Sequence, residues 1–153
     1  MEEWQEWRKI KNAANIFENA ANILKNYTIH GISNNIETEK SLAIPEIVLK
    51  VFSCELGLKS LLSKNGITYD KIHELTDLFE LLPTQIQENI RTSTKSIYNN
   101  VFQEECDFDS ELSKISKMFI EIRYYFEGEQ REIIVGFIDI FNSCILHSIG
   151  SYE

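Results

Sequence analysis

Two short stretches of the chain place ionisable side chains on or beside the apolar stripe of a predicted helix. In the first, Glu55 shares a helix face with Val51 and Leu58, which belong to a series of apolar residues spaced by three and four. In the second, Arg123 lies beside a comparable stripe, one turn after Phe119. Burying an unpaired carboxylate or guanidinium is costly, so each group needs a partner. The simplest expectation is that Glu55 and Arg123 pair with each other.

Such a pair has two interpretations, and the residues alone leave both open. Facing helices often hold a buried Glu–Arg pair that only fixes their register. Bundles also build ligand and catalytic pockets from polar side chains between helices. The other ligand-like residues near the predicted core faces are His73 and Glu127. Because arginine is not a metal ligand, the second interpretation predicts a polar site that works without a metal or any other cofactor.

The cysteines and histidines give no pattern typical of a metal centre. The three histidines are scattered, and no two have the spacing of metal ligands on one helix. The three cysteines form no CxxC pair, and Cys54 and Cys144 lie within apolar runs, where buried core residues are expected. The sequence also lacks a glycine-rich phosphate loop and the GxSxG, HExxH and EF-hand patterns.

Composition favours one domain that spans residues 1–153 and has enough chain for a sizeable core. A net charge of −9 disfavours a broad basic nucleic-acid surface and makes an acidic surface for a protein partner plausible. No apolar run approaches the roughly 18 residues that span a bilayer, and the acidic, aromatic N-terminus does not resemble a signal peptide. We therefore expect a cytoplasmic protein without a membrane segment.

Hydrophobic periodicity predicts an all-α fold, an antiparallel up-and-down bundle of four long helices with one or two short ones. The long helices are expected at residues 4–26, 41–64, 110–127 and 131–149, and further helices at 70–82 and 84–100. Ser41 is the expected N-cap of the second helix, with Pro45 in its first turn and Gly66 in the left-handed position after its end. Asp70 is the expected cap of the next helix, which Pro83 ends.

Other local signals predict details of the connections. Residues 27–40 are polar and are expected to form a loop. Gly57 lies inside a helix, where it either permits the close approach of a neighbour or has no effect. Asp107 and Asp109 are candidate caps after a linker, and His147 is placed to bond the last carbonyls of the final helix.

The predicted helix over 84–100 is mostly polar. Its weak apolar stripe consists of Ile86, Ile90, Ile97 and Val101. Arg91 and Lys95 lie four residues apart on one side, where charges are usually solvated but can also face an anionic partner. His73 stands at the start of the preceding helix, where a neutral, hydrogen-bonded imidazole is expected.

The order and spacing of these motifs resemble the HEPN superfamily (higher eukaryotes and prokaryotes nucleotide-binding). The resemblance covers about residues 43–146 and is carried by Phe52-Ser-Cys-Glu-Leu-Gly-Leu-Lys-Ser-Leu-Leu62, Gly66, His73-Glu-Leu-Thr-Asp-Leu-Phe79 and Phe119-Ile-Glu-Ile-Arg-Tyr-Tyr-Phe-Glu127. The chain is similar in particular to prokaryotic members with a Glu-x-x-x-Lys helix, a His-x-Leu helix start and an Arg-Tyr-x-x-Glu motif.

This resemblance implies an up-and-down helical bundle, usually a homodimer. Many members are metal-independent ribonucleases of toxin–antitoxin, abortive-infection and other phage-defence systems. In those, an Arg-x(4–6)-His motif from each protomer polarises the phosphate and assists proton transfer as a ribose 2′-hydroxyl attacks. Arg123 matches the motif arginine, but Gly128, Glu129 and Gln130 occupy the three positions where the histidine would stand, so the motif histidine is missing.

The expected site therefore departs from the family pattern. Its catalytic candidates are Arg123, Glu127 and His73, of which Glu127 or His73 takes over proton transfer. Its binding candidates are Glu55, Lys59 and Tyr124. The predicted function is engagement of RNA or a nucleotide, with metal-independent RNA cleavage as the reaction if the site is catalytic. The alternative is a non-catalytic helical interaction module whose Glu–Arg pair is structural.

Overall fold

The computed structural model describes residues 3–29, 36–118 and 135–150, and within these ranges every regular element is an α-helix. The elements are α1 (Glu3–Ile29), α2 (Ile36–Lys64), α3 (Leu75–Glu80), α4 (Thr84–Phe102), α5 (Phe108–Ser116) and α7 (Val135–Ile149). The predicted all-α fold is confirmed. Of the described helices, none is long and apolar enough to cross a bilayer.

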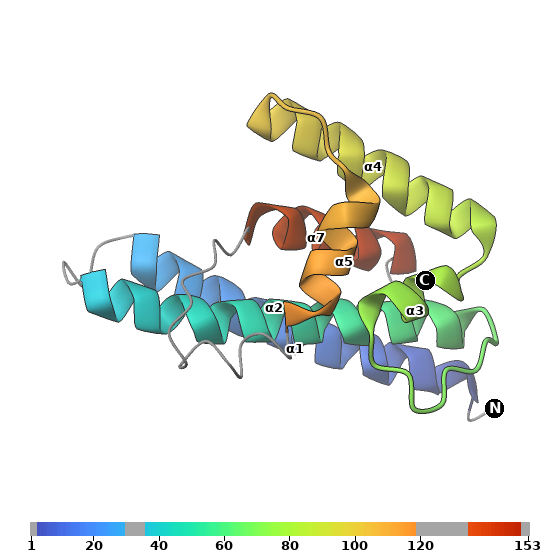
Figure 1. Ribbon diagram of the computed structural model, residues 1–153. Helices are drawn as coiled ribbons and strands as arrows, with labels where there is room; N and C mark the ends of the chain where they lie inside the picture. Colours follow the sequence, from blue (N-terminus) through green and yellow to red (C-terminus); the bar gives the residue numbers. More distant parts are fainter. Residues whose placement is uncertain (1–2, 30–35, 119–134, 151–153) are drawn as a thin grey trace.

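The long helices α1 and α2 lie side by side and antiparallel along the base of the molecule (Figure 1). Two buried serines of α2 bond directly to the backbone of α1. Ser53 Oγ donates to the carbonyl of Ala14 at 2.8 Å, and Ser60 Oγ donates to that of Trp7 at 2.8 Å. Since seven residues separate both the donors and the acceptors, these bonds fix one antiparallel register.

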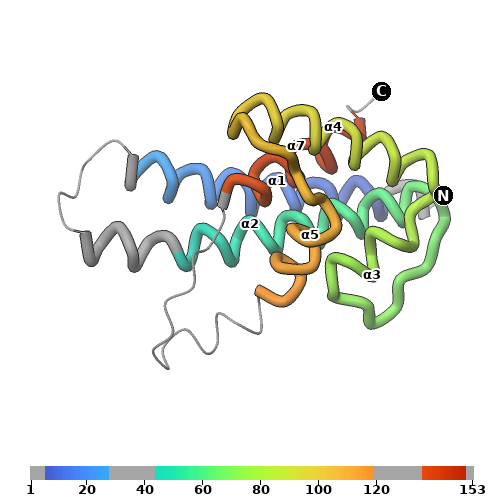
Figure 2. The backbone as a smooth tube through the Cα atoms, turned by 45° about the horizontal axis from the view of Figure 1, so that its top comes forward, coloured from blue at the N-terminus to red at the C-terminus, as the bar shows by residue number. Residues whose placement is uncertain are grey.

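Helix α7 packs against α2 on one side and against α4 on the other (Figures 1 and 2). Its fully buried residues include Phe137, Ile138, Phe141 and Ile145. Phe137 and Phe141 stack with centroids 5.5 Å apart, and the ring of Phe108 from α5 lies 5.7 Å from each. These rings join α5 and α7 into one core.

Gly57 lies where α2 and α7 approach closely, which confirms one of the two predicted roles. A Cβ atom at this position would lie 2.7 Å from Cγ2 of Ile145, a fully buried side chain. Replacing Gly57 by alanine gains about 1 kcal/mol of helix propensity but overpacks a rigid contact, which typically costs about 1–3 kcal/mol. We expect a net loss of roughly 1 kcal/mol in the free energy of unfolding, measured by urea denaturation.

The control for this prediction is Ile145→Leu, which removes the β-branch methyl that the new Cβ would meet. In a double-mutant cycle, Gly57→Ala should be less destabilising in the Ile145→Leu background. An equal loss of stability in both backgrounds would show that contact with Ile145 is not the cause of the destabilisation by Gly57→Ala.

The N-terminal boundary of α2 differs from the prediction. The helix begins at Ile36, so Ser41 is not its N-cap and Pro45 lies inside it. The expected loop over 27–40 is correspondingly shorter, since α1 extends to Ile29. Proline in a helix interior loses one backbone hydrogen bond. Helix α2 continues through it because its packing along α1 and into the core, as at the buried Ile47, outweighs the local signal.

The boundaries around α3 and α5 also differ. Helix α3 begins at Leu75 with Glu74 as N-cap, so Asp70 is not its cap. Asp107 caps α5 as predicted, accepting from the amide of Ser110 at 3.2 Å. Helix α5 ends at Ser116, so the predicted continuous helix over 110–127 is wrong at this point. Residues 119–134 lie outside the described part of the chain.

The buried stripe of α4 matches the predicted one at Ile90 but not further along the helix. Its buried residues are Ile90, Thr94 and Tyr98, whereas Ile97 and Val101 are 44% and 60% exposed. The buried residues of α4 follow one another in steps of four. Ile97 and Val101 each lie one position short of a step in this series, so they fall outside the buried face.

Arg91 of α4 has a structural role that the sequence did not suggest. Its guanidinium lies 4.6 Å from the ring centroid of Phe108 and donates to Asp109 at 2.6 Å. It therefore joins α4 to the start of α5 as a cation–π and ion-pair contact.

The carbonyl end of α7 is bonded by lysines of the two long helices. Lys64 Nζ donates to the carbonyl of Ile149 at 2.6 Å, and Lys11 donates to that of Gly150. These lysines make the bonds to the last carbonyls that were predicted for His147. They bring positive charge to the negative end of the helix dipole.

A charged network lies buried between α1, α2 and α7. Lys50, which is 2% exposed, forms ion pairs with one carboxylate on each neighbouring helix: Glu18 at 3.4 Å and Asp139 at 3.3 Å. It also donates to Asn22 Oδ1 at 2.9 Å. Glu46 is buried close by, and burial, followed by repulsion from Asp139, raises the pKa of its carboxyl.

The raised pKa of Glu46 predicts a pH-dependent stability effect. A group whose pKa is higher in the folded state contributes stability at low pH that is lost as pH rises through that pKa. Ionised Glu46 therefore destabilises the fold at pH 7, and Glu46→Gln should raise Tm there. The gain should disappear below the ordinary glutamate pKa of 4.5. Thermal unfolding at pH 4 and pH 7, with the exposed Glu88→Gln as control, tests this; a gain independent of pH would contradict it.

Candidate functional site

Helix α2 presents a carboxylate and an ammonium one turn apart. Lys59 Nζ donates to Glu55 Oε1 at 2.6 Å, an i,i+4 ion pair whose side chains are 14% and 9% exposed. Glu55 lies on the apolar stripe of α2, between the buried residues Val51 and Leu58. The helix therefore holds the carboxylate at the edge of the core, where it needs hydrogen-bond partners.

The loop after α2 carries His73 back to this carboxylate. The helix ends in a Schellman motif: Gly66 has φ +68°, its amide donates to the carbonyl of Ser63 at 3.0 Å, and the amide of Ile67 donates to that of Leu62 at 2.9 Å. The predicted left-handed role of Gly66 is confirmed. This motif reverses the chain, and His73 Nδ1 comes to lie 2.9 Å from Glu55 Oε1.

The bond between His73 and Glu55 defines the chemistry of the imidazole. A carboxylate can only accept hydrogen bonds, so Nδ1 of His73 is the donor. In the neutral ring, Nε2 then carries the lone pair and can accept a proton. Because the His73 side chain is 72% exposed, the ring is open to solvent and to a large ligand.

Lys59 completes a three-residue cluster, here called the Glu55–Lys59–His73 cluster. Its ammonium lies 3.4 Å from His73 Nδ1 and 5.8 Å from the ring centroid of Tyr69. The cluster thus offers one carboxylate, one cation and one imidazole at a solvent boundary. Such a set can bind a phosphate through the cation and move a proton through the ring.

Tyr69 is a part of this site that the sequence reading missed. It packs against the core from the loop that carries His73. Burial, followed by the charges of Glu6 and Asp70, raises the pKa of its phenol. Its spacing of four from His73 was the available signal, but a loop has no fixed periodicity from which to infer a shared face.

The predicted site residues divide into two groups. The structure brings together Glu55, Lys59 and His73, and these are partners of one another. Arg123, Tyr124 and Glu127 lie outside the described residues, so the expected Glu55–Arg123 pair stays a prediction. Within the described ranges, no three His, Cys, Asp or Glu side chains gather as they would around a metal ion.

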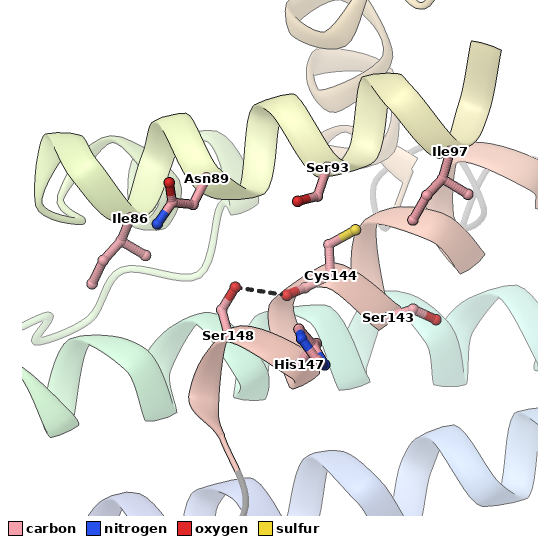
Figure 3. A pocket seen from close by; sticks show the side chains of 8 residues that line it. All are labelled: Ile86, Asn89, Ser93, Ile97, Ser143, Cys144, His147 and Ser148. Atoms are coloured by element: carbon pink, nitrogen blue, oxygen red, sulfur yellow. Dashed lines mark hydrogen bonds between the residues drawn. The ribbon is translucent and has the colours of Figure 1, made fainter. Parts of the chain in front are cut away.

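A separate hollow lies between α4 and α7, with a volume of about 680 Å³. Its walls run from Ile86 to Ile97 on α4 and from Ser143 to Ser148 on α7 (Figure 3). No sequence pattern predicts this hollow, because it arises only where two helices far apart in the chain meet.

A family model matches the part of the chain that contains the Glu55–Lys59–His73 cluster. The family model of the HEPN domain matches residues 52–137, which is more than half of the 153 residues. The chain belongs to the HEPN family. The HEPN match begins just before Glu55, includes Lys59 and His73, and extends into α7. Comparisons with curated proteins and with solved structures gave no match.

Proposed function

We propose that this HEPN protein engages RNA at the Glu55–Lys59–His73 cluster and cleaves it without a metal ion. The observation that carries the proposal is the hydrogen bond of His73 Nδ1 to Glu55, which leaves Nε2 of an exposed ring as the proton acceptor. The ribonuclease motif of the family lacks its histidine here, and His73 supplies an imidazole from a different element.

The proposed reaction is an internal transfer at phosphorus. His73 Nε2 removes the proton of a ribose 2′-hydroxyl, whose oxygen attacks the adjacent phosphorus. The bond to the 5′ oxygen breaks, and that oxygen takes up a proton from water, while the imidazolium of His73 returns its proton to solvent. The products are a 2′,3′-cyclic phosphate and a 5′-hydroxyl. Lys59 and Arg123 are proposed to stabilise the negative charge on the phosphoryl oxygens.

Glu55 has a positioning role in this proposal. It fixes the orientation of the imidazole and stabilises the imidazolium that forms when Nε2 takes a proton, as a carboxylate does for the histidine of hydrolytic triads. Glu127 is the alternative proton-transfer group, and Tyr124 is proposed to contact the nucleotide. Homodimerisation and a role in prokaryotic defence or a toxin–antitoxin pair are proposed from family membership.

A second candidate function is a non-catalytic interaction module. It is favoured by the burial of Glu55, which is 7% exposed and is paired through Oε1 with two partners of its own chain. In that case the cluster is structural, and the acidic surface of the chain binds a protein partner.

RNA cleavage in EDTA distinguishes the two functions. The parent protein should cleave RNA and leave 2′,3′-cyclic phosphate ends. Lys59→Met and Arg123→Ala should each lower the rate at least about 100-fold, and Lys71→Met, an exposed change in the same loop as His73, should not. Cleavage by none of the proteins would favour the interaction module. Cleavage at a rate that Lys59→Met leaves unchanged would place the reaction outside the Glu55–Lys59–His73 cluster.

A further inference from the structure

The hollow between α4 and α7, here called the α4–α7 groove, is elongated. Its two apolar ends are Ile86 and Ile97, which are eleven residues apart on one helix. At the helical rise of 1.5 Å per residue, the groove is about 16 Å long. The side chains between the ends are polar, and they come from both walls (Figure 3).

The lining carries hydrogen-bonding groups, among them the imidazole of His147, but no carboxylate, ammonium or guanidinium group. None of its eight residues is Asp, Glu, Lys or Arg, although the chain as a whole has a net charge of −9. A nucleic-acid backbone is a poor occupant, because its phosphates would meet no cation there. The lining therefore selects an uncharged occupant.

Two of the polar side chains already make one hydrogen bond within the chain, and this bond determines which donor or acceptor each has left for a ligand. Asn89 accepts from Gln85 through Oδ1 at 3.0 Å, so its amide nitrogen is a donor toward the groove. Ser148 Oγ donates to the carbonyl of Cys144 at 2.8 Å, so its lone pairs can accept (Figure 3). A donor on one wall and an acceptor on the other match the carbonyl and amide of a peptide backbone.

The groove is also open. Asn89, Ser93, Ser143 and His147 are exposed, and Cys144 is the buried member of the lining. Small-molecule sites usually bury most of their ligand, whereas an extended chain can lie in an open trough. About 16 Å corresponds to the span of roughly five residues of extended chain.

We propose that the α4–α7 groove binds an uncharged, extended peptide segment of a partner protein, with an apolar side chain at each end. The end side chains contact Ile86 and Ile97, and the backbone between them bonds to Asn89 and Ser148. This interface is separate from the Glu55–Lys59–His73 cluster, because α7 packs between α2 and α4. It holds whether or not the cluster cleaves RNA.

The test uses a defined peptide pool and amide NMR of the full chain. The pool consists of acetylated hexapeptide amides with Leu, Ile, Val or Phe at both ends and Gly, Ser, Asn or Thr between. It should shift the amide signals of residues 86–97 and 143–148 with a dissociation constant below about 1 mM. A matched pool with Ser or Thr at both ends should bind at least about tenfold more weakly.

Variants on one helix provide the control. Ser93→Trp fills the groove from an exposed position and should weaken binding at least about tenfold; Ser96→Trp, exposed on the same helix but outside the lining, should not. Three outcomes would overturn the proposal: no shift with the first pool, the same shifts with uncharged nucleosides, or self-association that Ser93→Trp abolishes, which would make a second copy the occupant.

Discussion

Replacing His73 by asparagine is expected to lower the rate of metal-free RNA cleavage by about 10²–10⁴-fold, the contribution typical of a positioned proton-transfer group. Asparagine can still bond to Glu55 but cannot accept a proton at neutral pH. The stability of the fold should change by less than about 0.5 kcal/mol, because the side chain is 72% exposed. Single-turnover cleavage in EDTA and thermal unfolding measure the two effects.

His147→Asn is the matched control for this prediction. His147 is also exposed, but it belongs to the α4–α7 groove. Its replacement should leave the cleavage rate within about twofold of the parent. Equal losses in the two variants, or an unchanged rate for His73→Asn, would assign proton transfer to another group, with Glu127 the next to replace.

The largest loss of stability is expected for Lys50→Met. This change keeps most of the side-chain volume but removes the charge that pairs with Glu18 and Asp139 between three helices. Breaking a buried pair leaves an uncompensated charge and typically costs about 3–5 kcal/mol. We expect a loss near the lower limit, because Asp139 keeps its pair with Lys25 at 2.6 Å. Urea denaturation at pH 7 gives the free energy of unfolding.

Lys25→Met provides the comparison, since it removes a partner of the same carboxylate from a side chain that is 40% exposed. Exposed ion pairs contribute at most about 1 kcal/mol, so its effect should be much smaller. The double variant Lys50→Met/Asp139→Asn should recover part of the loss. Similar losses in the free energy of unfolding for the two variants would show that the contribution of Lys50 does not depend on its burial.

Features governed by local backbone chemistry could be predicted from the sequence. Gly66 forms the C-terminal turn of α2, and Asp107 caps α5, because each depends on neighbours within a few residues. For Gly57 the sequence left both close packing and no effect open, and the neighbour that decides between them, Ile145, lies 88 positions later. Pro45 was misread for the same reason, since long-range packing with α1 overrides a local signal.

The candidate site was predicted only in part. The partner expected for Glu55 was Arg123, whereas its partners among the described residues are Lys59 and His73. The family resemblance had placed both of these in the same site. The loop that joins them has no periodicity, so the contact between His73 and Glu55 required the fold. Lys50 gave no sign of burial, because a lysine is ordinarily a surface residue and its ion-pair partners lie on two other helices.

The most direct test of the proposed site is NMR of the histidine ring nitrogens during titration with RNA whose 2′-hydroxyls are methylated, which can bind but not react. Before RNA is added, neutral His73 should carry its proton on Nδ1, as its bond to Glu55 requires. RNA should then shift the His73 Nε2 signal and leave that of His147 unchanged. A proton on Nε2, or RNA binding that leaves the His73 signals unmoved, would contradict the proposal that this cluster engages RNA.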